Sequence, residues 1–293
     1  MRRALVPIAL LALWWTWCRT GDSTAPRPLR VGTFNIRSFP EPDTDLARVA
    51  ERIADMDADL FAIQEVRGLD ALDQVLADAS AATGRHLARS TATYCASDRY
   101  RIAVVWDQGR LQLVEERPLT SPRRCSTGQP SAHLVLLEAE GGERIGMVAT
   151  HLKAGGGEEE ARRRRREWRE LVALVGALRR ELGAPIVVAG DFNSTGWHDD
   201  QHGERSYIDE LLRGTDMRLV TGELACTAYW RPGGGDTFAP STLDHILVAG
   251  AAEGVRVLGM CERQRCEPRA SREMADDYRR VSDHCPVVAD LPR

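Results

Sequence analysis

The stretch Ala-Pro-Ile-Val-Val-Ala-Gly-Asp-Phe-Asn, from Ala184 to Asn193, is an apolar, β-rich run that stops abruptly at a glycine, a carboxylate and a carboxamide. Ile186 to Val188 contain no polar side chain that could face water, which predicts a strand buried on both faces. Asp191 then follows at the end of that strand, where α/β proteins commonly hold reactive side chains on a rigid scaffold. The alternative is that Asp191 and Asn193 only close an Asx turn.

The same arrangement recurs four more times along the chain. In each case a carboxylate, carboxamide or imidazole lies at the end of an apolar β-type run, or just after it. The four stretches are Thr33-Phe34-Asn35-Ile36, Ile63-Gln64-Glu65-Val66, Thr150-His151-Leu152-Lys153, and Leu243-Asp244-His245 taken with Ser282-Asp283-His284.

In order and residue type, these five stretches resemble the endonuclease/exonuclease/phosphatase superfamily, the metal-dependent phosphodiesterases and phosphomonoesterases that include the DNase I type. The resemblance runs from Arg30 to the C-terminus. No single tetrapeptide is specific, whereas the ordered set is. The resemblance implies a four-layer α/β sandwich, in which two mixed β-sheets pack face to face with helices outside.

The resemblance also implies a metal site. Hard divalent cations such as Mg²⁺ bind oxygen ligands and keep several waters, which leaves room for a substrate phosphate. Glu65 is the first candidate ligand, because Phe61 and Ile63 before it indicate burial beside a site rather than a surface ion pair. Asn35 and Asp283 complete the implied ligand set or its immediate support. Mg²⁺ is the expected ion, with Mn²⁺ or Ca²⁺ as alternatives.

The remaining motif residues suit proton transfer and phosphate binding. By the resemblance, His284 is the catalytic imidazole and Asp244 is the carboxylate that orients it. Asp191 is the alternative base. Asn193 is expected to donate a hydrogen bond to the phosphoryl oxygen or the attacking water, and His151 to donate to the phosphate or protonate the leaving oxygen.

The expected substrate is a phosphodiester, with nucleic acid first. Abasic-site repair members of the family typically have tyrosine in the region of position 151, whereas Thr-His-Leu-Lys resembles the DNase I type and several secreted or lipid-directed members. Lys153, Arg37 and the arginine run Arg162 to Arg166 are candidate phosphate contacts. The net charge of −4 excludes a protein that coats nucleic acid by bulk electrostatics.

Two other functions stay open. One is a sphingomyelinase-like or inositol-phosphate phosphoesterase. The other is a binding module that has lost the chemistry, which would predict broken motifs, and here every motif position has a competent residue type. A monomer without a stable protein partner is expected.

The N-terminus indicates export. Arg2 and Arg3 precede an apolar segment, Ala4 to Trp17, that is too short to span a bilayer, which needs about 20 apolar residues. Residues 1–20 are therefore predicted to be a signal peptide or membrane-targeting segment, 21–28 a flexible leader and 29–293 the catalytic domain. A lipid anchor on Cys18 is the minor alternative, because the bulky Trp17 precedes it.

Six cysteines remain besides Cys18, and an even number in an exported chain indicates disulfides. Cys261 with Cys266, and Cys95 with Cys125, are the candidate pairs. Zinc is the rival, although no Cys-x-x-Cys spacing is present.

Hydrophobic periodicity predicts the main elements. Helices are expected over Thr44 to Met56, capped by Asp43 or Thr44, over Leu69 to Thr83, from the arginine run onward after a loop of residues 153–160, and over Ser206 to Leu212. Strands are expected over Leu29 to Ile36, Asp59 to Val66, Ile102 to Trp106, Leu111 to Val114, Leu134 to Leu137, Ile145 to Thr150, Cys226 to Trp230, Thr242 to Val248 and Cys285 to Ala289, with a loop from Arg231 to Ser241.

The other histidines and the arginine run are assigned no catalytic role by sequence. Alternation sends His245 to the opposite strand face from Asp244, so His245 is expected to be structural. His133 and His86 are expected in surface or loop positions, and His198 and His202 in an exposed loop. The arginines fan around their helix, which favours a solvated surface over a phosphate-binding rim.

Overall fold

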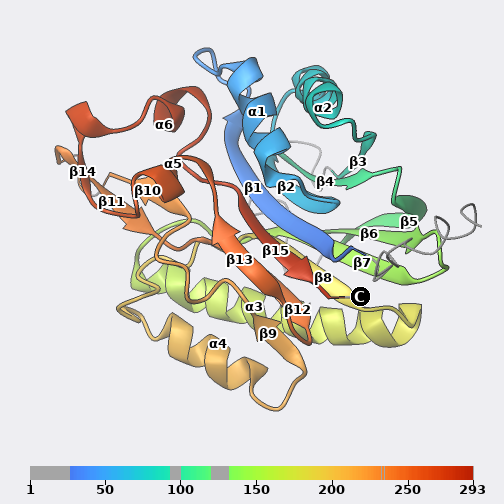
Figure 1. Cartoon of the computed structure of the whole chain (residues 1–293). Coiled ribbons are helices and arrows are strands. Elements are labelled where there is room, and N and C mark those ends of the chain that lie inside the picture. Colours follow the sequence, from blue (N-terminus) through green and yellow to red (C-terminus); the bar gives the residue numbers. More distant parts are fainter. Residues whose placement is uncertain (1–26, 93–99, 120–131, 232, 234, 293) are drawn as a thin grey trace, which may run out of the picture.

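Two six-stranded β-sheets pack face to face in the computed structural model, which describes residues 27–92, 100–119, 132–231, 233 and 235–292 (Figure 1). The first sheet has the order β13 (Glu253–Val257), β15 (Val287–Leu291), β1 (Leu29–Phe39), β2 (Leu60–Val66), β4 (Arg101–Asp107) and β3 (Leu87–Ala92). The second has the order β5 (Leu111–Leu119), β6 (Ala132–Ala139), β7 (Arg144–His151), β8 (Ile186–Asp191), β12 (Asp244–Ala249) and β9 (Met217–Leu219).

Helices cover the outer face of each sheet, which confirms the four-layer sandwich (Figure 1). On the first sheet lie α1 (Leu46–Met56) and α2 (Leu69–Thr83), and on the second lie α3 (Glu158–Leu182) and α4 (Glu204–Leu212). Short helices α5 (Gly259–Arg263) and α6 (Asp277–Arg280) and the 3₁₀ turn Ser271–Glu273 belong to the C-terminal part. A separate apolar cluster fills the space between the two sheets.

Three helix starts differ from the prediction, and one of them is α4, which begins at Glu204 rather than at Ser206. The side chain that caps α1 belongs to Asp45, which accepts a hydrogen bond from the Arg48 backbone N–H, and not to Asp43 or Thr44. Helix α3 begins at Glu158, so the predicted loop over residues 153–160 is too long. The first turn of α3 contains Glu158, Glu159 and Glu160, and acidic side chains are favourable there because they interact with the positive end of the helix dipole.

Each sheet contains one parallel pair, β1 with β2 and β7 with β8, and every other pairing is antiparallel. Helix α1 connects the first parallel pair and α3 connects the second, as parallel strands require a crossover. The carboxyl ends of the two strands of a parallel pair lie at the same edge of their sheet. Glu65, His151 and Asp191 stand at or next to three of these strand ends, whereas β1 continues past Asn35 to Phe39, so the predicted strand end at Ile36 is too early. Asn35 is the last residue of the continuous pairing of β1 with β2 before the register shifts.

A small third sheet lies beside the sandwich, made of β10 (Ala228–Trp230), β11 (Thr237–Ser241) and β14 (Arg269–Ala270). The predicted loop from Arg231 to Ser241 is therefore wrong in its second half, because β11 pairs with both neighbours. The strand reads Thr-Phe-Ala-Pro-Ser, and its proline hides the strand pattern in the sequence.

The predicted disulfide between Cys261 and Cys266 is also wrong. Cys226 pairs with Cys266, which joins the segment before β10 to the segment after α5, and Cys261 pairs with Cys285, which joins α5 to the segment before β15. Cys261 and Cys266 are only five positions apart, yet each is bonded to a cysteine more distant in sequence. Cys95 and Cys125 lie outside the described residues, as do residues 1–20 and Cys18.

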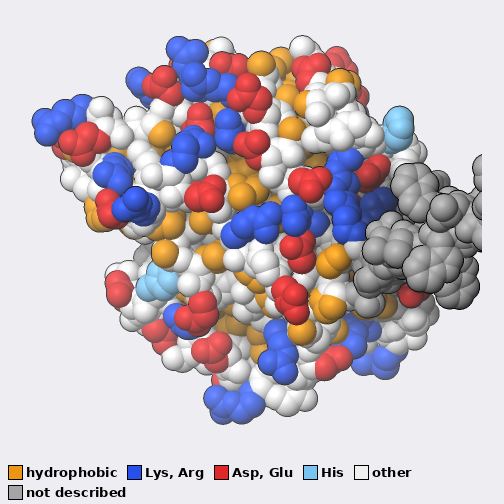
Figure 2. Space-filling view, viewed as in Figure 1, with side chains coloured by type: hydrophobic (Ala, Val, Ile, Leu, Met, Phe, Trp, Pro, Cys, Tyr) orange, Lys and Arg blue, Asp and Glu red, His pale blue; other side chains and the backbone are white. Residues whose placement is uncertain are grey.

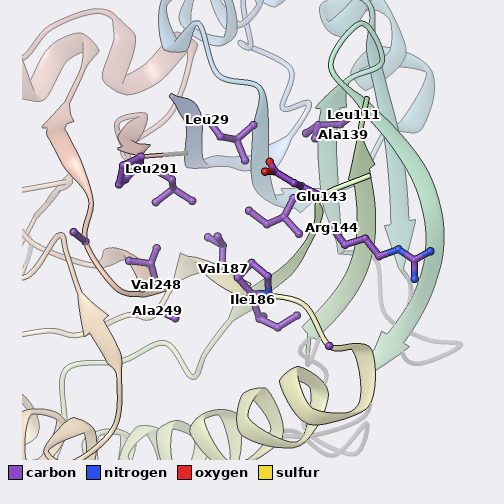
Figure 3. Close-up of a pocket in the computed structure, with 15 residues that line it drawn as sticks. Leu29, Leu111, Ala139, Glu143, Arg144, Ile186, Val187, Val248, Ala249 and Leu291 are labelled. Atoms are coloured by element: carbon purple, nitrogen blue, oxygen red, sulfur yellow. The ribbon is translucent and has the colours of Figure 1, made fainter. Parts of the chain in front are cut away.

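An apolar cavity of about 500 Å³ opens between the two sheets at the opposite strand ends from the candidate residues (Figure 3). Leu29 and Leu291 of the first sheet face Ile186 and Val248 of the second across it. The cavity is thus separate from the candidate residues. Within the described ranges, no helix combines the length and apolar character needed to cross a membrane.

Candidate active site

Asp191 is the centre of the candidate site. Its Oδ2 accepts a hydrogen bond from Asn35 Nδ2 at 2.9 Å and lies 3.4 Å from His151 Nε2 and 3.7 Å from His284 Nε2. Its Oδ1 accepts a hydrogen bond from the Asn193 backbone N–H at 2.8 Å. The carboxylate is buried. Five predicted site residues, Asp191 included, therefore meet at one point.

Strand register explains why three of these side chains are neighbours. Asp191 on β8 pairs with His151 on the parallel strand β7 and with Asp244 on the antiparallel strand β12. Gly190 makes this close packing possible, because a Cβ at this position would lie 2.0 Å from the Thr150 carbonyl oxygen. Larger residues at position 190 would push the strands apart exactly where the site forms, so the glycine before Asp191 has a packing role.

Glu65 reaches the site through a distortion of β2. The pairing of β2 with β4 shifts register between Ile63 and Val66, and Glu65 has a left-handed φ of 64°. Such a bulge redirects a side chain, and the unusual φ of the backbone costs conformational energy. Glu65 Oε1 accepts from Asn35 Nδ2 at 3.0 Å, and Oε2 accepts from the Ser38 backbone N–H at 2.8 Å.

The charge state of Glu65 follows from these contacts. Burial raises the pKa of the Glu65 carboxyl, but the nearby His151 imidazole and the hydrogen bond from Asn35 outweigh burial, and the net pKa lies below its usual range. The carboxylate is therefore ionised at neutral pH, as a metal ligand must be.

His284 and Asp244 form the predicted pair. His284 Nδ1 lies 2.8 Å from Asp244 Oδ2, so that Nε2 of the same ring points toward Asp191. Burial raises the pKa of Asp244 to about 6, against the opposing effect of the His284 charge. Burial lowers the pKa of His284, but the carboxylates of Asp244 and Asp191 outweigh it and hold that pKa well above its usual range.

Two hydroxyls that sequence reasoning missed fix this pair. Thr227 Oγ1 accepts hydrogen bonds from the backbone N–H groups of Leu243 and Asp244, both at 2.9 Å. Ser282 Oγ donates to the Asn35 carbonyl oxygen at 2.7 Å and accepts from the His284 N–H at 3.1 Å. Ser282 precedes the Asp-His motif directly and could have been singled out, whereas nothing in the sequence distinguishes Thr227.

Asp283 lies beside the site with most of its side chain buried. Burial raises the pKa of its carboxyl, which the charges of His284 and Arg37 partly oppose and that of Glu65 reinforces. Its backbone carbonyl accepts a hydrogen bond from the Tyr229 N–H at 2.9 Å. Its assignment to the metal shell stays a prediction.

Asn193 is turned partly toward the protein. It has a left-handed φ of 53°, and its Nδ2 donates to the Leu152 carbonyl oxygen at 3.2 Å. This bond ties the end of β8 to the residue after His151. Asp191 therefore closes a turn and also belongs to the site. Its Oδ1 accepts from the Asn193 N–H, while its Oδ2 faces the other site residues.

The donor set fits a hard divalent cation. Among the described residues, two groups have ligand atoms within 4.8 Å of one another: Glu65 with His151 and Asp191, and Asp191 with Asp244 and His284. Each group contains two carboxylates, which such cations prefer. In the described part of the chain, the buried atoms His151 Nδ1 and Asp244 Oδ1 have no hydrogen-bond partner.

The other histidines separate into different environments. His245 is buried against Trp197, with ring centroids 4.7 Å apart, and its Nδ1 lies 3.1 Å from Thr221 Oγ1, so it is structural as predicted. His86 is exposed in a loop. The expectation for His133 is wrong, because it is buried on β6 with Nε2 2.6 Å from Ser90 Oγ.

The loop histidines His198 and His202 make polar contacts with the protein. His198 Nε2 lies 2.8 Å from Thr242 Oγ1. His202 is half-buried, with Nδ1 3.2 Å from Glu158 and Nε2 3.0 Å from the Gly156 carbonyl oxygen.

One arginine of the run is neither solvated nor on a rim. Arg164 is fully buried and pairs with Glu204 of α4 at 2.8 Å. It also donates to the Lys153 and Gly155 carbonyl oxygens at 3.1 and 2.6 Å and to Thr195 Oγ1 at 3.1 Å, and so joins the loops that follow β7 and β8. The signal was available: Arg164, Trp168, Leu171, Val175 and Leu178 share one helical face.

The other candidate phosphate contacts are engaged with the protein. Arg37 donates to the Tyr278 and Arg279 carbonyl oxygens and to Glu41. Lys153 Nζ donates to the Ala154 carbonyl oxygen at 2.7 Å. On the face in Figure 2, Lys and Arg side chains are interspersed with Asp and Glu, and they form no broad patch of one sign.

Carboxylates, imidazoles and carboxamides from both sheets gather at one end of the α/β sandwich. This arrangement is characteristic of one class of hydrolases. The chain belongs to the endonuclease/exonuclease/phosphatase family, whose model matches residues 32–284. Hydrolases of this family act on phosphate esters and are generally metal-dependent. A search of curated proteins finds no match.

Solved structures share the fold at low sequence identity. The human nocturnin catalytic domain with bound sulfate is 20% identical, with a TM-score of 0.61, over 91% of this chain and 95% of that one. TDP2 from D. rerio with a single-strand DNA product is 14% identical, with a TM-score of 0.62, over 89% and 98%. A mannosyl-6-phosphatase from Bacteroides thetaiotaomicron is 18% identical, with a TM-score of 0.57, over 89% and 98%.

Proposed function

We propose that this chain is an exported, Mg²⁺-dependent phosphodiesterase whose substrate is nucleic acid. The observation that carries the proposal is the convergence on Asp191 of Asn35, His151 and His284, with Asp244 behind His284 and Glu65 behind Asn35. Hydrolysis of a phosphate ester needs a positioned water, a proton acceptor and donors to the phosphoryl oxygens. These side chains have the groups to position the water, accept its proton and donate to the phosphoryl oxygens.

Roles follow from the contacts. Glu65 and Asp191 are the carboxylates that would hold the cation, with Asn35 and Asp283 in support, and a bound cation would neutralise charge on the phosphoryl and leaving oxygens. His284, oriented by Asp244, binds the phosphate through Nε2 as the imidazolium that the neighbouring carboxylates favour, and it would accept the proton of the attacking water only in its neutral form. Asp191 is the alternative base.

His151 donates to the phosphate or to the leaving oxygen, since its Nε2 faces the same centre. Asn193 is assigned a second donor role through the Nδ2 hydrogen that does not bond to Leu152. Two disulfides support an exported protein, because such bridges persist in oxidising compartments.

The test is hydrolysis by the purified chain of supercoiled DNA, linear DNA, RNA and bis-p-nitrophenyl phosphate, with Mg²⁺ and with chelator. We expect chelator-sensitive cleavage of nucleic acid that is lost in His284→Ala and retained in His86→Ala, which alters an exposed histidine outside the site. Turnover of the small diester without cleavage of nucleic acid would overturn the assigned substrate. Undiminished cleavage by His284→Ala would overturn the assigned site.

A further inference from the structure

Trp230 is an exposed aromatic residue on the third sheet. The exposed large hydrophobic residues among those the structure describes are Leu113, Val114 and Trp230, and Trp230 has 45% of its surface exposed. Leu113 and Val114 lie on β5, the edge strand of the second sheet. Trp230 instead ends β10, the strand that contacts the segment containing Asp283 and His284.

Strand pairing places Trp230 on the same face as His284. Ala228 forms an antiparallel bridge with His284, and the Tyr229 N–H donates to the Asp283 carbonyl oxygen at 2.9 Å. Directly opposed residues of antiparallel strands share a face, and side chains two residues apart on one strand do so as well. The bridge is a single one, so it places Ala228 beside His284, and Trp230 follows two residues further along β10 on the same side of that strand.

Several contacts hold the strand that carries Trp230. Tyr229 faces the other way into a buried cluster, and its hydroxyl donates to the Glu267 carbonyl oxygen at 3.0 Å. The disulfide between Cys226 and Cys266 ties the start of the strand, and Trp230 itself pairs with Ala239 of β11. A large side chain on such a support loses little further freedom when a ligand covers it.

From this geometry we infer that Trp230 is a substrate-binding residue, on which a nucleobase next to the scissile phosphate stacks. The inference rests on the proposed function and names the part of the substrate that lies beside His284. Ala239 and Ser241 of β11 are half-buried and lie on the Trp230 face, so small side chains flank the indole and leave room for a flat ring. Arg231 follows directly and is exposed, which adds positive charge for a phosphodiester backbone.

The surroundings of Trp230 favour a base over a lipid surface. The sequence that follows, Arg231 to Asp236, reads Arg-Pro-Gly-Gly-Gly-Asp and contains no large apolar residue. A hairpin that enters a bilayer interface needs a larger apolar face than one indole. A single aromatic ring beside a cation is instead the arrangement of a base-stacking platform.

The test measures binding in Mg²⁺ in the His284→Ala background, where the strand stays intact. Two labelled single strands are compared by fluorescence anisotropy: oligothymidylate, and a strand of equal length built from tetrahydrofuran abasic units. We expect Trp230→Ala to weaken binding of the base-containing strand by about 5- to 100-fold and to leave the abasic strand unchanged. Trp230→Phe should retain most of the affinity, and Leu113→Ala is the matched exposed control.

Equal losses for the two strands, or no loss for either, would overturn the inference, as would a parent protein that binds the two strands equally. Loss of binding to phosphatidylcholine and sphingomyelin vesicles in Trp230→Ala, with strand binding unchanged, would replace the base by a lipid surface and overturn it too. Base-dependent binding by a wild-type chain that hydrolyses no phosphodiester would support Trp230 and overturn only the proposed function.

Discussion

His284 Nδ1 lies 2.8 Å from Asp244 Oδ2, across 40 positions of sequence. The pair joins the two halves of the sandwich, because Asp244 begins β12 of the second sheet and His284 precedes β15 of the first. Asp244 is fully buried, and the hydroxyl of Thr227 holds its backbone. The orientation of the His284 ring is therefore set by both sheets at once.

Replacing Asp244 by Asn should impair turnover without unfolding the chain. The carboxamide keeps the shape but can no longer accept from Nδ1 with a full negative charge, so the ring loses its fixed orientation. We expect kcat to fall about 10²- to 10⁴-fold. The measurement is cleavage of a phosphodiester under saturating Mg²⁺, with circular dichroism as the folding check. A kcat within twofold of wild type would remove Asp244 from the mechanism.

Replacing Glu65 by Gln should weaken metal binding directly. The variant keeps its volume and loses the charge that Asn35 and Ser38 hold in place. We expect the affinity for Mg²⁺ or Mn²⁺, measured by isothermal titration calorimetry, to fall at least about 10-fold. Glu210→Gln is the control, since Glu210 is an exposed residue of α4. Equal affinities in the two variants would exclude Glu65 as a ligand.

Replacing Arg164 by Met should destabilise the fold strongly, because Glu204 would keep a buried charge without its partner. The expected loss in the free energy of unfolding is about 3–5 kcal/mol, measured by urea denaturation. Adding Glu204→Leu should recover much of that loss, since the uncompensated carboxylate is gone. The double variant still lacks the bonds from Arg164 to the loops after β7 and β8. An additive double variant would show that the two side chains act independently.

His245 should make the chain sensitive to acid. Burial lowers the pKa of this imidazole to about 3 in the folded state, while an exposed histidine titrates near 6.5. Between these values the unfolded chain binds a proton that the folded chain does not, so stability falls as the pH drops. The expected contribution is about 1.4 kcal/mol per pH unit.

The check is urea denaturation at several pH values, with His245→Phe beside the wild-type chain. Phenylalanine keeps the contact with Trp197 and cannot be protonated. The free energy of unfolding of the wild-type chain should therefore fall relative to that of His245→Phe as the pH drops below about 6.5. A difference that does not change with pH would mean that His245 titrates normally or that its proton is accommodated in the fold.

Local sequence patterns determined much of this protein. Continuous apolar runs such as Ile186 to Val188 indicated the buried strands, and the helical spacing of Leu72, Val75, Leu76 and Ala79 indicated α2. The position of Asp191 at a strand end was readable for the same reason, because strand period is a local property, whereas β1 continues past Asn35 to Phe39.

Tertiary structure decided everything that depends on which distant segments become neighbours. Three such contacts join residues far apart in sequence. They are the disulfides of Cys261 and Cys266, the buried ion pair of Arg164 with Glu204, and the hydrogen bond from the Asp244 N–H to Thr227 Oγ1. Strand order and register fix those contacts, and no local periodicity encodes them. The same limit applies to Glu65, whose inward aim comes from a bulge in β2. Sequence alone thus named the reactive side chains, and packing of the two sheets decided how they face one another around Asp191.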